Sequence, residues 1–130
     1  MWRIETRDRG RRTALMRVVD QATRTGDYRT PWRAVPAVWS HYKNEAEVLR
    51  ALQRMWSVEL GGAMFAALRS GDGDVAQDLA LAYTDALAAM HGVHGILEAH
   101  ADHPAIAAER RKEAKLLASA GLRFSKRSVA

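Results

Sequence analysis

Residues 70–74 read Ser70-Gly71-Asp72-Gly73-Asp74, and this short polar stretch lies between two long segments with helical periodicity. Glycine and aspartate are typical turn residues. The segment before the turn covers residues 44–69, and the one after it covers residues 74–101. Helices joined by a short connection are usually antiparallel neighbours. The stretch therefore predicts a long helical hairpin on which the rest of the chain packs.

Both segments of the hairpin carry apolar residues at three- and four-residue spacing, which is typical of helices with one buried face. Asn44 and Glu47 resemble a capping box at the start of the first helix. Gly61-Gly62 interrupts the first helix, and this pair predicts close approach of a neighbouring helix or, alternatively, a kink. The second helix has a heptad pattern suited to packing against one partner helix, made of Ala76, Leu79, Tyr83, Ala86, Met90, Val93, Leu97 and His100.

Shorter helices are expected on both sides of the hairpin. The first covers residues 11–25 and ends at Gly26, and the last begins at Pro104 and ends before Gly121. Residues 28–42, between the first helix and the hairpin, are rich in aromatic side chains. We expect these side chains to cover one end of the core or, alternatively, to form a ligand surface. The sequence thus predicts an all-α fold, a small helical bundle in a single domain of 130 residues, with flexible basic arms at 1–10 and 122–130.

The composition restricts the classes of function. The chain has no cysteine, which excludes disulfides and thiolate chemistry. Neither a secretory signal nor a run of about 18 apolar residues is present, so we expect a cytoplasmic protein without a membrane span. Glycine-rich nucleotide-binding motifs, His-Glu-x-x-His and Gly-x-Ser-x-Gly are all missing. This favours a protein that is not an enzyme and needs no cofactor.

Charge is unevenly distributed along the chain, whose formal net charge is +5. Residues 1–33 carry nine arginines and four acidic residues, whereas residues 72–102 carry six acidic residues and no lysine or arginine. One interpretation is that the basic segments pack against the acidic helix of the same or another subunit. The other is nucleic-acid binding through a set of terminal basic residues: Arg7, Arg9, Arg11, Arg12, Lys126 and Arg127.

Two His-x-x-x-Glu pairs could contribute to a metal site. His41 and Glu45 lie at the start of the first long helix, and His94 and Glu98 lie near the end of the second, followed by His103. The register of the hairpin places these five residues at its open end, where imidazoles and carboxylates can bind Fe, Mn or Zn. In helix number and in these two pairs, the chain resembles hemerythrin-like bundles. The alternative is structural, with His94 as a hydrogen-bonded core residue and Glu45 as a helix-start acid.

Self-association is the first functional expectation. The flanking helices are short or weakly amphipathic, so the long hairpin has little intramolecular cover. A second copy in a homodimer, or another protein, would supply the missing contacts. Nucleic-acid binding is the second hypothesis and a metal-binding bundle is the third.

Overall fold

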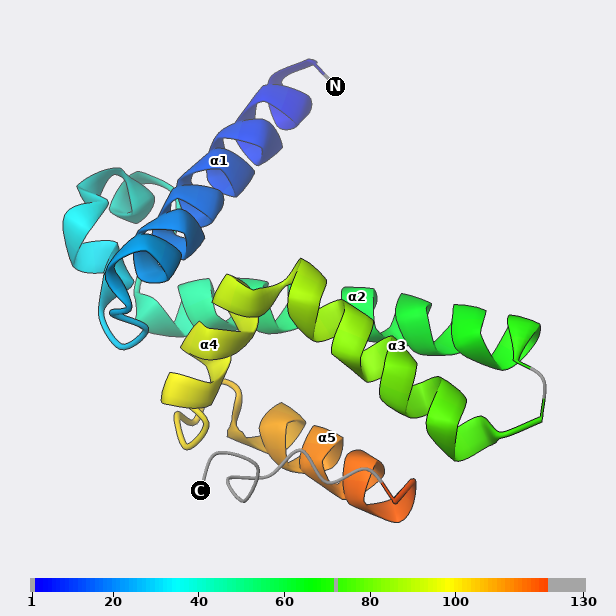
Figure 1. Ribbon diagram of the computed structural model, residues 1–130. Coiled ribbons are helices and arrows are strands. Elements are labelled where there is room, and N and C mark those ends of the chain that lie inside the picture. The colour runs from blue at the N-terminus through cyan, green and yellow to red at the C-terminus, as the bar shows by residue number, and fades with distance from the viewer. Residues whose placement is uncertain (1, 72, 122–130) are drawn as a thin grey trace.

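The computed structural model describes residues 2–71 and 73–121, and the basic segment 122–130 lies outside these residues. The described part contains five α-helices and no strand (Figure 1), which confirms the all-α prediction. The helices are α1 (Trp2–Thr25), α2 (Glu45–Ser70), α3 (Val75–Ala89), α4 (His91–Ala99) and α5 (Ala107–Ser119). Two short 3₁₀ helices, η1 (Pro31–Ala34) and η2 (Pro36–Ser40), connect α1 to α2.

The start of α2 follows the sequence prediction. The Asn44 side chain accepts a hydrogen bond from the backbone N–H of Glu47 at 3.0 Å. The Glu47 carboxylate accepts a hydrogen bond from the backbone N–H of Lys43 at 3.1 Å. These bonds satisfy amide groups that a helix start leaves without intrahelical partners. At the start of α3, the Asp74 side chain accepts a bond from the N–H of Gln77 in the same manner, at 3.1 Å.

The hairpin of α2 and α3 is present, but its second helix is shorter than predicted. The helix expected over residues 74–101 is interrupted at Met90, whose φ of −128° and ψ of 39° lie outside the helical range. The chain then continues as α4, which packs against α1. A Cβ atom on Gly92 would lie 2.7 Å from Val19 and 2.5 Å from Thr23, so α4 and α1 approach closely because position 92 lacks a side chain.

Two further predictions about helices were wrong. Residues 2–10, expected to be an arm, continue α1, whose N-terminal half projects away from the other helices in Figure 1. Gly61 and Gly62 were expected to face a neighbouring helix or to bend α2. A Cβ atom on either would meet nothing within 4 Å, and α2 runs through both glycines.

The core lies where α2, α4 and the C-terminal half of α1 meet. Its largest fully buried side chains come from these helices and from the connections between them: Trp56, Leu49, Leu52, Ile96, Leu97, Ile106, Val18, Val38, Val48 and Val93. Within the predicted heptad pattern, Tyr83, Ala86, Val93 and Leu97 are buried, and Met90 between them is half-buried. The aromatic residues between α1 and α2 differ in burial. Trp32 and Tyr42 are buried in the core, whereas Trp39 is exposed.

Candidate functional site

His94 and Glu98 lie one helical turn apart on α4, and their side chains approach each other as predicted. His94 Nε2 is 3.7 Å from Glu98 Oε1. The third member of this group comes from α5. Nη2 of Arg110 lies 3.3 Å from Glu98 Oε1 and 3.3 Å from His94 Nε2. An arginine therefore supplies positive charge at the position between the imidazole and the carboxylate.

Arg110 also forms a bidentate pair with Glu113 on the same helix. Nη1 donates to Oε1 at 3.1 Å and Nη2 donates to Oε2 at 3.2 Å. Both side chains are largely buried, with exposed fractions of 6% and 9%. Bidentate geometry offsets part of the cost of removing two charges from water. Glu113 further accepts a hydrogen bond from the indole Nε1 of the core residue Trp56 at 2.5 Å.

The imidazole of His94 is neutral in this environment. Its ring lies 4.6 Å from the ring of Trp56, measured between centroids. Burial, and after it the nearby charge of Arg110, lower the pKa of His94 to about 4. The hydrogen bond leads to the same conclusion, because an arginine can only donate and Nε2 must therefore be unprotonated. The proton of the neutral ring is thus assigned to Nδ1.

Tyr83 completes the cluster from α3. Its hydroxyl lies 3.4 Å from His94 Nε2, and its ring meets Trp56 edge to face, with centroids 6.0 Å apart. Burial raises the pKa of Tyr83 to about 12, and the negative charge of Glu113 acts in the same direction. The phenol therefore remains protonated at neutral pH. We call these residues the polar cluster: Trp56, Tyr83, His94, Glu98, Arg110 and Glu113.

The other three residues of the predicted metal set lie elsewhere. The imidazole of His41 packs against Gly10 of α1, at 3.1 Å from the position of a Cβ on that glycine. Glu45 is exposed in the first turn of α2. His103 Nδ1 accepts a hydrogen bond from the backbone N–H of Ala105 at 3.0 Å.

The five residues His41, Glu45, His94, Glu98 and His103 therefore do not converge. Within residues 2–71 and 73–121, no group of three or more histidine or carboxylate side chains is placed to hold a metal ion. Near His94 and Glu98, the guanidinium of Arg110 makes the contacts that a cation would make.

Most polar atoms of the polar cluster are bonded within the cluster, but Nε of Arg110 is buried and has no hydrogen-bond partner among the described residues. The four surface hollows that we describe are lined by other residues. Among the cluster members, only Glu98 is substantially exposed, with 54% of its side chain accessible. The imidazole acceptor, the guanidinium and the Glu113 carboxylate all bond to each other or to Trp56. The arrangement holds α5 against α2, α3 and α4.

Sequence reasoning missed the contribution of α5. Its middle, residues 109–113, reads Glu-Arg-Arg-Lys-Glu, and this run of charges makes the last helix look weakly amphipathic. A signal was nevertheless present, because Ile106, Arg110, Glu113 and Leu117 follow one another at steps of four, three and four. That spacing places Arg110 and Glu113 on the same face as two apolar residues. The buried ion pair could have been found there.

The predicted nucleic-acid contacts are only partly described. Arg7, Arg9 and Arg12 are exposed on α1. Arg11 is half-buried, and its guanidinium carbon lies 4.6 Å from the ring centroid of Tyr42. Lys126 and Arg127 lie outside the described residues.

Comparison with known proteins found no match to a protein-family model, a curated protein or a solved structure. Among the described residues, no helix combines the length and the apolar character needed to cross a membrane.

Proposed function

We propose that the protein works by self-association, through the face that α2 and α3 present near their shared turn. The single observation that carries this proposal is a pair of adjoining hollows of opposite charge on this face, each lined by one exposed large apolar residue, Val58 in one and Leu81 in the other. The polar cluster also supports this proposal, because the His94 imidazole, the Arg110 Nη atoms and the Glu113 carboxylate already bond to each other or to Trp56. Of the fully buried side-chain nitrogen and oxygen atoms in the cluster, only Arg110 Nε lacks a hydrogen-bond partner among the described residues.

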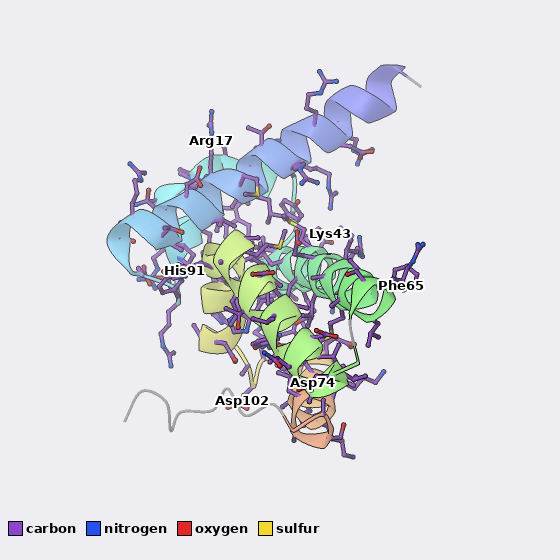
Figure 2. The ribbon with its side chains drawn as sticks, turned by 45° about the vertical axis from the view of Figure 1, so that its right-hand side comes forward. Arg17, Lys43, Phe65, Asp74, His91 and Asp102 are labelled. Carbon is purple, nitrogen blue, oxygen red and sulfur yellow. The ribbon has the colours of Figure 1, made fainter. Side chains whose placement is uncertain are left out.

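Exposed apolar side chains concentrate on this hairpin. Of the seven large hydrophobic residues exposed in the described part of the chain, five lie between residues 58 and 81, namely Val58 (71%), Phe65 (62%), Leu81 (57%), Val75 (54%) and Leu68 (53%). Figure 2 shows Phe65 at the edge of the molecule formed by α2. Because Leu52, Trp56 and Leu60 are buried on the opposite side, this part of α2 is apolar nearly all round. Such a helix is normally covered on both sides.

Two neighbouring hollows follow the hairpin and meet at Ala63. The proximal hollow has a volume of about 440 Å³ and includes Arg12, Arg54, Val58 and Glu59 in its lining. The distal hollow has a volume of about 460 Å³ and is lined by Asp78, Leu81, Asp85 and small residues. Two arginines against one carboxylate make the proximal hollow basic, and two aspartates make the distal hollow acidic.

This charge distribution fits a second copy of the chain. In a two-fold symmetric dimer each partner uses the same patch, turned end for end. An axis near Ala63 would bring the proximal hollow of one copy against the distal hollow of the other. The arginines would then face the aspartates twice, while Val58 and Leu81 would be covered from both sides. Opposite charges placed in this way favour one register over others.

Two leucines with nearly equal exposure test the apolar part of the interface. Leu81, with 57% exposed, lines the distal hollow, whereas Leu116, with 54% exposed, lies on α5 outside both hollows. Sedimentation equilibrium should show a dimer for the native chain and for Leu116→Ser. Leu81→Ser should raise the dissociation constant at least tenfold, because about 1.5 kcal/mol or more of apolar burial is lost in each copy. A native chain that stays monomeric at high concentration contradicts the proposal.

A charge exchange tests the two-fold arrangement itself. Arg54→Glu and Asp85→Arg should each weaken the dimer, since each creates two like-charge contacts across the axis. The combination Arg54→Glu with Asp85→Arg should restore association. In that variant a glutamate at position 54 of one copy faces an arginine at position 85 of the other, so opposite charges are again in contact. The control is Arg50→Glu, which changes an exposed α2 arginine outside both hollows. Equal weakening by Arg50→Glu would show that net charge, and not register, controls association.

A further inference from the structure

The projecting end of α1 is a second surface with a distinct composition. Among residues 7–25 of α1, whose side chains the structure describes, burial begins at Ala14. Before Ala14, Gly10 meets His41 and Arg11 lies over Tyr42. Residues 7–9 are all exposed. In Figure 1 the helix continues beyond this point without another helix beside it. Fold stability alone gives no reason for the helix to extend so far.

The net charge of residues 7–12 is positive. Residues 7–12 read Arg-Asp-Arg-Gly-Arg-Arg, so four arginines accompany one aspartate. At 100° per residue, Arg7 and Arg11 lie on one side of the helix, and Arg9 and Arg12 lie on the other. Within the described part of the chain, none of these arginines has a carboxylate within ion-pair distance. Like charges three and four residues apart repel each other along a helix, so an external anion would relieve this repulsion.

The shape of this end indicates which polyanion it suits. A membrane-surface helix needs a continuous apolar face beside its basic one. In the sequence of residues 2–13 the only large apolar residues are Trp2 and Ile4, whose spacing of two does not form one helical face. A helix with its side chains is about 10–12 Å across, and the major groove of B-form DNA is about 12 Å wide. Arginines on opposite sides of such a helix can reach phosphates on both walls of the groove. The major groove of RNA helices is too narrow for this arrangement.

We propose that the projecting end of α1 binds duplex DNA without sequence preference, with Arg7, Arg9 and Arg12 as its phosphate contacts. Arg11 stays over Tyr42 and supports the base of the projecting segment. Further along α1, Arg17 lies on the side that faces away from the rest of the molecule in Figure 2, where it extends the positive surface. Arg12 also lines the proximal hollow of the hairpin, so the proposed dimer and the DNA would share this one residue. Arg7 and Arg9 lie outside both hollows, so substituting them tests DNA binding without altering the dimer face.

The experiment uses the full chain and a fluorescent 30-base-pair duplex of mixed sequence, with fluorescence anisotropy between 50 and 200 mM NaCl. Each phosphate contact contributes about −0.9 to the slope of log K against log salt concentration, so three contacts predict a slope near −2.7. The test variant is Arg7→Gln with Arg9→Gln. It should bind at least tenfold more weakly at 100 mM NaCl, and its slope should be smaller by about 1.8.

The matched control is Arg111→Gln with Lys112→Gln, which removes the same charge from exposed positions on α5. Its affinity should stay within threefold of the native value. Equal losses in both variants would mean that net charge alone attracts DNA, and this would overturn the assignment to α1. Absence of binding at 50 mM NaCl would overturn it too, as would tighter binding to duplex RNA or to vesicles of anionic lipid than to the DNA. Circular dichroism of each variant checks that the fold is kept.

Discussion

The indole of Trp56 donates a hydrogen bond to the carboxylate of Glu113, which lies 57 positions later in the chain. Trp56 is fully buried in the core, and Glu113 is itself held by the guanidinium of Arg110. This bond connects the centre of α2 to a helix with few apolar contacts. Its energetic importance follows from burial, because removing one member leaves the others in a medium that solvates them poorly.

Removal of the Glu113 carboxylate is therefore expected to be costly. Glu113→Ala leaves the buried Arg110 without its bidentate partner, and the free energy of unfolding should fall by about 3–5 kcal/mol. Urea denaturation measures this loss. Glu109→Ala, on the exposed side of the same helix, should change stability by no more than about 0.5 kcal/mol. The double variant Arg110→Met with Glu113→Leu should lose less than Glu113→Ala alone, and a larger loss would contradict this account.

The stability of the protein should depend on pH through His94. Its pKa is about 4 in the folded state, while its ordinary value is 6.5. Between these values the unfolded chain binds a proton that the folded chain does not, so stability falls as pH decreases from 6.5 to 4. The slope is at most about 1.4 kcal/mol per pH unit. Above pH 6.5 the imidazole is neutral in both states and its contribution to the slope vanishes.

The comparison for this prediction is His94→Gln, whose amide oxygen can accept the bond from Arg110 without titrating. Urea denaturation at a series of pH values should give a shallower decline for this variant below pH 6.5. Identical pH profiles for the two proteins would show that His94 is not held neutral in the folded state.

Glycine substitutions should have opposite effects at two helical positions. Gly92→Ala should destabilise the protein by about 1–3 kcal/mol, because the new methyl group would lie within 2.7 Å of Val19 and Thr23 atoms. Gly61→Ala meets nothing within 4 Å, and it should stabilise α2 by about 0.5–1 kcal/mol. Thermal unfolding compares the two. Stabilisation by Gly92→Ala would mean that α1 and α4 are not in close contact.

The cap at Asn44 offers a test of local helix energetics. Asn44→Ala removes the acceptor for the backbone N–H of Glu47, and the expected loss is about 1 kcal/mol. Asn44→Asp keeps an acceptor at the same place and should retain nearly all of the stability. Chemical denaturation distinguishes the two variants, and an equally large loss for both would argue against the side-chain cap.

Local signals predicted the fold well where they were strong. The turn at residues 70–74, the caps at Asn44 and Asp74, and the stop at Gly26 all depend on neighbouring residues, and each is present. Gly92 and Gly95 indicate that the second half of this helix can bend, but the heptad pattern continues across Met90 and does not predict a break at that residue. The cause of the break lies in tertiary packing, where Gly92 allows α4 to approach α1 closely.

At the candidate site, too, the sequence predicted contacts within one helix but not contacts between helices. Spacing within one helix correctly paired His94 with Glu98, since both lie on α4. The surroundings of His94 and Glu98 depend on contacts with a helix distant in the sequence. Arg110 of α5 lies beside them, where the pair of His41 and Glu45 was expected. The register argument for His41 and Glu45 assumed a straight hairpin out to residue 101. The break at Met90 removes that assumption.

The polar cluster also determines where α5 can dock. An apolar stripe can slide along its partner and exchange one contact for a similar one. Sliding by one turn would move Arg110 and Glu113 about 5.4 Å away from Trp56 and His94 and leave buried charges without partners. A helix with little apolar surface is thereby restricted to one position on the bundle. The outward side of α5 is then free to accept substitutions, since the choice of position does not depend on it.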